Sequence, residues 1–130
     1  MNRQIILIRK RNHYYMTTIN SIELEKLIKN NDIAEMIDKF SRLGYGNPTP
    51  TCYEFCVTHY MKSVEEMRSF QNEMSNSEAD RSVLSKLRTK KLQWSCTSIL
   101  CDSIINHPQY KKHLKSKQIL PIHIQLTEIN

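Results

Sequence analysis

Apolar side chains recur every three or four positions along most of this chain, which is the spacing of amphipathic helices. Most of these stretches open with a residue that can accept a hydrogen bond at a helix N-terminus, such as Asn20 or Asp32, and the last follows Pro108, which suits the first position of a helix. Together the two patterns predict helices from Asn20 to about Asn31, from Asp32 to Leu43, from Cys52 to Met61, from Val64 to Met74, from Ser77 to about Asn106 and from Gln109 to Lys117.

Four capping boxes, each a Ser, Thr or Asp followed three residues later by an acid, set the expected helix starts. They are Asp32 with Glu35, Thr51 with Glu54, Ser63 with Glu66, and Ser77 with Asp80. The box at Ser63 predicts a break between two helices near residue 62. Glycine and proline in residues 44–50 predict a loop, because proline interrupts a helix and glycine permits positive φ.

Two short segments have the pattern of strands. Residues 5–8 are four consecutive branched apolar side chains, and Ile122, Ile124 and Leu126 alternate with polar residues. We therefore expect a mainly α-helical fold, a compact bundle of five to seven helices with a two-stranded sheet pairing the chain ends. The expected organisation is a single domain, 1–130, with a basic N-terminal segment (1–18), a helical core (20–117) and a C-terminal strand and tail (118–130).

The charges are sorted along the chain, which has a net charge of +6. Residues 1–22 contain four bases and no acid, residues 23–80 contain eleven acids and six bases, and residues 81–130 contain nine bases and two acids. Two cationic ends around an acidic middle indicate that the ends bind a polyanion or that parts of the chain attract one another.

Three basic clusters are the candidate binding residues. The first interleaves cations with aromatic rings that can stack on unpaired bases, and the other two are predicted to lie on helices. The clusters are Arg9, Lys10, Arg11, Tyr14 and Tyr15; Lys86, Arg88, Lys90 and Lys91; and Lys111, Lys112, Lys115 and Lys117. Positive charge held at this spacing favours RNA or DNA backbone as the partner, with an acidic protein surface as the other possibility.

The sequence contains no pattern that predicts catalysis, a cofactor or a metal site. Glycine occurs only at positions 44 and 46, too few for repeated phosphate-cradling loops. Cys52, Cys56, Cys96 and Cys101 lack the spacing of a zinc ribbon or finger, so we interpret them as small buried side chains. We therefore expect a protein that is not an enzyme.

No targeting or membrane segment is predicted, since the longest apolar run is the four residues 5–8. We expect an intracellular, reducing location in the cytoplasm or nucleus, with the cysteines as thiols. The acid-free start is similar in charge to a mitochondrial presequence, which keeps a mitochondrial location as the alternative.

Two resemblances to known families bear on function. Residues 50–74, with Phe70, Glu73 and Met74 at their end, resemble one unit of a pentatricopeptide repeat, a helical hairpin. The residues after Met74 do not repeat the pattern, and arrays need several units, so we do not expect an array. The order of helices, the late Trp94 and the richness in isoleucine, lysine and asparagine look somewhat like the small poxviral Bcl-2-like proteins. That resemblance implies a helical bundle that binds host signalling partners.

The interpretation we favour is a non-catalytic basic helical protein that binds nucleic-acid backbone or belongs to a ribonucleoprotein assembly. The alternative is a protein–protein interaction module whose apolar groove or acidic middle docks a partner, such as a poxviral Bcl-2-like antagonist of host signalling.

Overall fold

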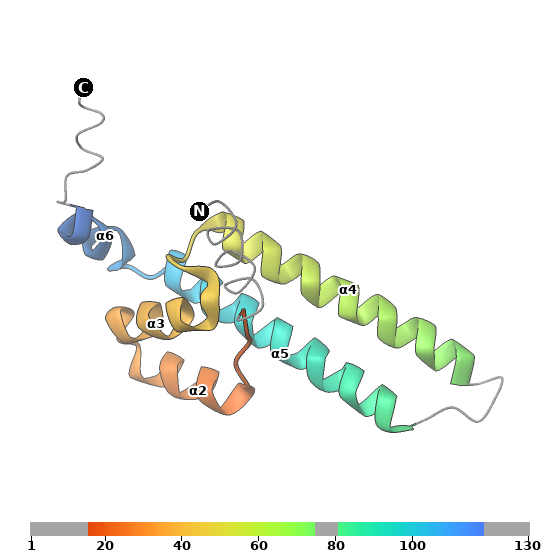
Figure 1. The fold of residues 1–130 in the computed structure, drawn as a ribbon. Coiled ribbons are helices and arrows are strands. Elements are labelled where there is room, and N and C mark those ends of the chain that lie inside the picture. The colour runs from red at the N-terminus through yellow and green to blue at the C-terminus, as the bar shows by residue number, and fades with distance from the viewer. Residues whose placement is uncertain (1–15, 75–80, 119–130) are drawn as a thin grey trace, which may run out of the picture.

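The computed structural model describes residues 16–74 and 81–118, and this part of the chain contains five α-helices and one π-helical turn (Figure 1). The helices are α2 (Ser21–Asn30), α3 (Ile33–Phe40), α4 (Pro50–Met74), α5 (Arg81–Ile105) and α6 (Tyr110–Gln118), and the π turn η1 is Ser41–Tyr45. The predicted mainly α-helical fold is confirmed. The strands predicted at residues 5–8 and 122–126 lie outside the described residues.

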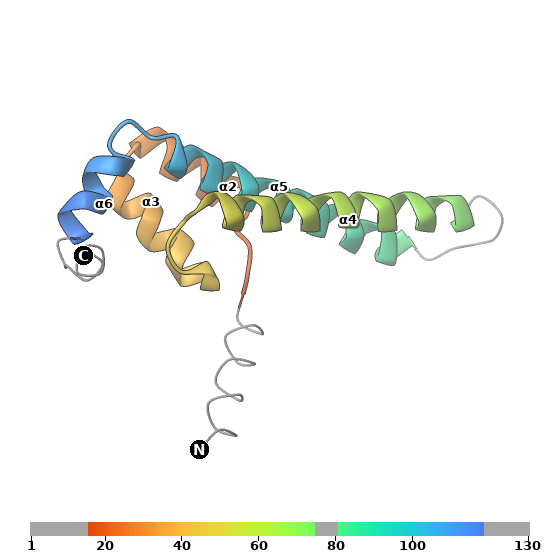
Figure 2. The same cartoon turned by 90° about the horizontal axis from the view of Figure 1, so that it is seen from above.

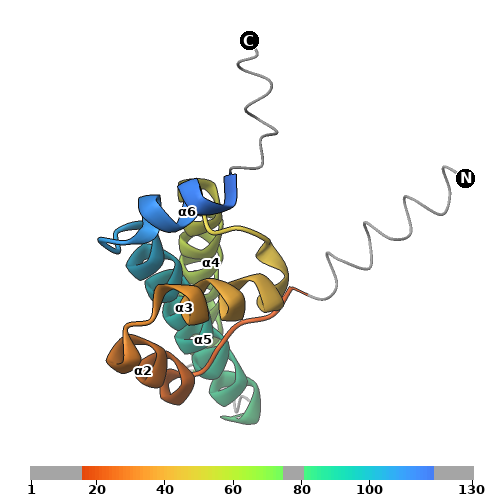
Figure 3. The ribbon, with the colours of Figure 1, turned by 90° about the vertical axis from the view of Figure 1, so that its left-hand side faces the viewer.

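The longest elements, α4 and α5, form an antiparallel hairpin (Figures 1 and 2). α2, α3 and α6 gather at the end of the hairpin where α4 begins and α5 finishes, as the view along it shows (Figure 3). The other half, residues 62–74 of α4 and 81–93 of α5, extends beyond the three short helices (Figure 2). We call this half the arm.

The two long helices pack along a seam with the alternating three- and four-residue spacing of a coiled coil. Every residue at these positions is buried or half-buried. On α4 they are Tyr53, Cys56, Tyr60, Ser63, Met67, Phe70 and Met74, and on α5 they are Leu84, Leu87, Lys91, Trp94, Ser98, Cys101 and Ile105. Small residues in the seam, such as Ser63 at 1% exposure, allow the two backbones to approach each other.

The predicted break between two helices near residue 62 is wrong, because α4 is continuous from Pro50 to Met74. Ser63 is buried in the seam, and its hydroxyl donates a hydrogen bond to the Tyr60 carbonyl oxygen at 2.7 Å within the same helix. A serine bonded in this way cannot cap a new helix. A pentatricopeptide unit would also require two antiparallel helices over residues 50–74, where the structure has one.

The start of α4 also differs from the prediction, which placed the cap at Thr51. The hydroxyl of Thr49 accepts a hydrogen bond from the backbone N–H of Cys52 at 3.2 Å, and Pro50 is the first helical residue. Proline suits that position, because its fixed φ is helical and its missing N–H would have no partner within the helix.

The predicted caps of the first two helices are confirmed. The side chain of Asn20 accepts a hydrogen bond from the N–H of Glu23 at 2.8 Å. Asp32 accepts from Ala34 at 3.0 Å and from Glu35 at 3.3 Å. Asn31, between the two helices, has a left-handed backbone (φ 50°), which asparagine adopts more readily than most residues.

One hydrophobic core joins the short helices to the C-terminal half of α5. Its buried members are Ile19, Leu24, Leu27, Ile33, Met36, Phe40, Leu43, Cys96, Leu100, Cys101 and Ile104. The extended residues 16–20 pack here as well, since the backbone N–H of Ile19 donates to the hydroxyl of Thr97 at 3.2 Å and that of Thr17 donates to the Leu43 carbonyl at 2.8 Å. The hydroxyl of Tyr110 donates to the Pro48 carbonyl, which ties α6 to the loop before α4.

Candidate functional site

The second basic cluster lies on the arm, where α5 distributes its four residues around the helix. Lys86 and Lys90 are four residues apart and share one exposed face, whereas Arg88, also exposed, lies roughly on the opposite face. Lys91 lies in the seam and is half-buried. The structure therefore places only part of this cluster on any one surface.

The arm is cationic despite containing part of the acidic middle. Its residues include seven bases and three acids. The ammonium of Lys90 lies 4.0 Å from a carboxylate oxygen of Glu66, and the two side chains stay 55% and 46% exposed. An ion pair this long and this solvated contributes little to stability, so Lys90 keeps most of its capacity to bind an anion.

The third basic cluster lies on α6, at the other end of the molecule (Figure 1). Lys111 and Lys112 are exposed there; Lys115 and Lys117 are on the same helix, and their side chains are outside the described part. Lys90 precedes the end of α5 by fifteen residues, which is about 22 Å along the helix axis. The second and third clusters therefore do not form one continuous patch. The first cluster, Arg9, Lys10, Arg11, Tyr14 and Tyr15, lies outside the described residues.

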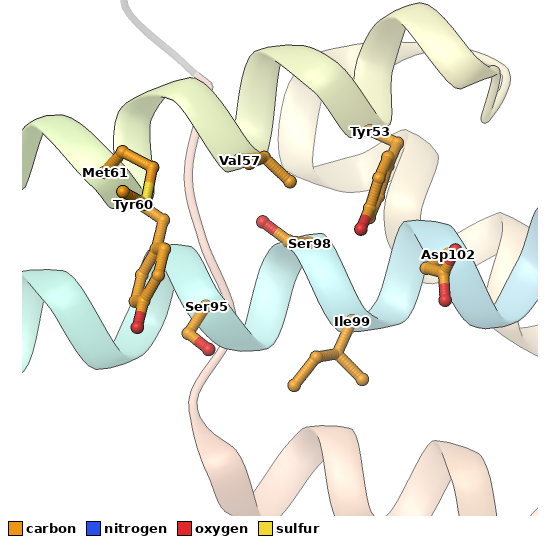
Figure 4. Close-up of a pocket in the computed structure, with 8 residues that line it drawn as sticks. All are labelled: Tyr53, Val57, Tyr60, Met61, Ser95, Ser98, Ile99 and Asp102. Atoms are coloured by element: carbon orange, nitrogen blue, oxygen red, sulfur yellow. The ribbon is translucent and has the colours of Figure 1, made fainter.

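A second candidate site is a groove of about 280 Å³ between α4 and α5 on one side of the hairpin. We call this side the groove face. Figure 4 shows the α4 residues along one edge of the groove and the α5 residues along the other, with Ile99 pointing away from α4. The lining residues are Tyr53, Val57, Tyr60, Met61, Ser95, Ser98, Ile99 and Asp102. Met61 and Ile99 are 51% and 45% exposed, so an apolar surface faces the solvent.

The buried thiols of Cys56 and Cys101 are poor nucleophiles. All four cysteines are free thiols. Cys56, Cys96 and Cys101 are buried, as predicted, whereas Cys52 is half-buried. Burial is the main cause that raises the pKa of the Cys56 and Cys101 thiols to about 12. Neighbouring thiols add to the effect, Cys101 and Cys52 for Cys56, and Cys52 for Cys101. Because the thiolate is the reactive form, these two groups are protonated and unreactive near neutral pH.

The aromatic residues beside the thiols act in packing. The ring of His59 stacks on Trp94, with centroids 4.6 Å apart, and Phe55 meets both rings at 4.3 and 6.0 Å. Trp94 is thus half-buried between the two long helices, as expected of a core anchor. Within residues 16–74 and 81–118, no three His, Cys, Asp or Glu side chains are arranged to hold a metal ion.

Comparison of the chain with protein-family models, with curated proteins and with solved structures found no match. The resemblance to the poxviral Bcl-2-like proteins therefore stays a prediction. None of the helices in the described part of the chain is both long enough and apolar enough to cross a membrane.

The groove residues were not among those predicted from the sequence, although part of their spacing is visible in it. Val57, Met61 and Val64 follow one another at four and three residues beside the seam. Placing a helix boundary at Ser63 divided this stripe in two. A helix that continues through Ser63 has two apolar stripes, one facing α5 and one facing solvent.

Proposed function

We propose that this protein binds nucleic-acid backbone without catalysis and that the arm is a principal contact. The observation that carries the proposal is the exposure of Lys86, Arg88 and Lys90 on a projecting pair of helices with excess positive charge. A phosphate chain can approach an arm from several sides, so residues on different faces can contribute. Non-specific binding of this kind requires only cations at suitable spacing.

The remaining basic clusters belong to the same proposal as further contacts. Lys111 and Lys112 of α6 are exposed, and residues 9–15 supply both cations and aromatic rings. Because α6 and the arm lie at opposite ends of the hairpin, one nucleic acid that meets both must follow the length of the molecule (Figure 1).

The test is salt-dependent binding of the full chain to a labelled single-stranded RNA, measured by fluorescence anisotropy. We expect the double variant Lys86→Ala/Lys90→Ala to bind more weakly and to reduce the slope of log affinity against log salt by about 0.7 for each phosphate that the protein no longer neutralises. The matched control is Lys26→Ala/Lys29→Ala, which removes two exposed charges from α2.

Two results would contradict the proposal. If the wild-type protein does not retain RNA or DNA at low salt, it does not bind nucleic-acid backbone. If the α2 control loses as much affinity for RNA as the arm variant, binding depends on net charge alone and the arm is not a specific nucleic-acid contact.

A further inference from the structure

We propose that the groove face binds a second copy of this chain, with the two hairpins packed face to face around a twofold axis. This inference shares Arg88 with the proposed nucleic-acid site and otherwise rests on different residues. Its starting observation is that two apolar groove residues, Met61 and Ile99, are 51% and 45% exposed. Leu92, which is 52% exposed, lies seven residues before Ile99 and therefore shares its face of α5. The face is two helices wide, and an apolar strip of that kind is usually covered by further helices.

The register of the hairpin shows which residues lie at the same level on its two helices. Cys101 lies close enough to Cys56 across the seam to raise the pKa of its thiol, and further along the hairpin the ammonium of Lys90 is 4.0 Å from a carboxylate oxygen of Glu66. Because the helices are antiparallel, each step forward on α4 is matched by a step backward on α5. Met61 therefore lies level with Ser95, at the middle of the groove face.

On α4, charges of opposite sign stand at equal distances from that middle. Glu54 precedes Met61 by seven residues and Arg68 follows it by seven. Seven residues are nearly two helical turns, so all three share one face of the helix. Glu54 and Arg68 are both exposed.

On α5, charges of opposite sign likewise lie at equal distances on either side of Ser95. Arg88 precedes it by seven residues and Asp102 follows it by seven, and both are exposed. The antiparallel register puts Asp102 at the level of Glu54 and Arg88 at the level of Arg68. The groove face thus has two acids, Glu54 and Asp102, near α6, an apolar middle and two arginines, Arg68 and Arg88, on the arm, where the exposed Glu65 also lies one turn before Arg68.

Each end of the face collects like charges within one chain. No ion pair in the described residues involves Glu54, Arg68, Arg88 or Asp102; the carboxylate of Asp102 accepts a hydrogen bond from the Asn106 side chain at 2.9 Å. Two like charges at one level repel each other modestly, and a partner of opposite charge would relieve that repulsion.

A second copy supplies that partner at both ends. Rotation by 180° about an axis through the middle of the face puts the acidic end of one chain on the basic end of the other. Arg88 then meets Asp102 of the second copy, Arg68 meets its Glu54, and Met61 lies beside its own equivalent. A twofold contact repeats each pair, so the face contains four ion pairs around an apolar centre. If the two hairpins ran in the same direction, the arginines of one copy would face those of the other, so charge favours hairpins that run in opposite directions.

The size of the face indicates a weak dimer. Arg88 and Asp102 are fourteen residues apart, about 21 Å along the axis, and two helices are about 20 Å wide. A contact with this length and width buries an area at the small end of the range found for specific protein–protein interfaces. We expect dissociation at roughly micromolar concentration.

The experiment is sedimentation velocity of the full chain, without nucleic acid, from about 5 to 500 μM. We expect a reversible dimer in the wild type and a shift to monomer in Arg88→Glu, which places a carboxylate against Asp102 of the other copy, and likewise in Asp102→Arg. The double variant Arg88→Glu/Asp102→Arg should regain the dimer, because the pair re-forms with its charges exchanged. Circular dichroism of each variant checks that these exposed substitutions leave the fold intact.

An apolar pair of variants tests the centre of the face. Leu92→Glu should abolish the dimer, whereas Ile22→Glu, at an apolar position on α2 that is 64% exposed against 52% for Leu92, should leave it unchanged. If the wild-type protein stays monomeric at 500 μM, the groove face does not bind a second copy of this chain and the proposal is wrong. The proposal is also wrong if the dimer persists in both Arg88→Glu and Leu92→Glu, or if Arg88→Glu/Asp102→Arg fails to restore the dimer.

Discussion

The hydroxyl of Thr97 offers a sharp test of how the N-terminal residues are held on the core. Thr97 is fully buried on α5; it donates to the Gln93 carbonyl at 2.9 Å and accepts from the backbone N–H of Ile19 at 3.2 Å. Ile19 is only 1% exposed, so water cannot replace this bond. Thr97→Val keeps the shape of the side chain and removes the acceptor that the Ile19 N–H uses among the described residues.

The expected cost follows from the buried donor that the valine variant leaves without a partner. Such a group lowers the free energy of unfolding by about 1–3 kcal/mol. With a urea slope of about 2 kcal/mol per molar, the unfolding midpoint should fall by about 0.5–1.5 M. Thr97→Ser retains the hydroxyl and removes one buried methyl, for a cost of about 0.8 kcal/mol.

Stability alone separates the two variants poorly, so amide hydrogen exchange supplies the deciding measurement. The amide of Ile19 should be protected in the wild type and in Thr97→Ser, and should exchange much faster in Thr97→Val. Protection of that amide in the valine variant, or an unchanged urea midpoint, would refute the reasoning.

Two further predictions concern α4 and the thiols. Because α4 is continuous, Val64→Pro should lower the free energy of unfolding in urea by about 3 kcal/mol or more. Val64→Ala is the control. A protein that tolerates the proline would instead have a helix that starts after Ser63. Between about pH 9 and 12, unfolded thiols lose their protons whereas buried Cys56 and Cys101 keep theirs. The free energy of unfolding is therefore at its full value below pH 9 and should fall as pH rises through this window, with a weaker fall in Cys56→Ala/Cys101→Ala; equal pH slopes would contradict that origin.

The local features of the chain were predictable because they depend on neighbours in sequence. The caps at Asn20 and Asp32 bond to backbone groups two or three residues away, so their residue types alone indicate them. The apolar spacing from Val83 to Ile104 similarly predicted α5. Local patterns failed at Ser63, where the capping-box motif is present and the helix nevertheless continues.

The reason for that failure is tertiary. Serine and glutamate three residues apart suit a helix start, and they are equally compatible with a helix interior when the serine is small enough for a tight seam. Packing against α5 decides between the two, since it buries Ser63 and extends the seam from Tyr53 to Met74. No pattern within ten residues contains that information.

The sequence by itself determined the helical class, most helix boundaries, the burial of three of the four thiols and the sorting of charge along the chain. Only the tertiary structure decided that Lys86 and Lys90 face away from Arg88, that α6 lies far from the arm, and that an apolar groove opens between α4 and α5. Periodicity describes one helix at a time, whereas a surface is made by residues far apart in sequence, such as Ile19 and Thr97, 78 positions apart. Their proximity depends on how residues 16–20 and the short helices pack against α5 around one core.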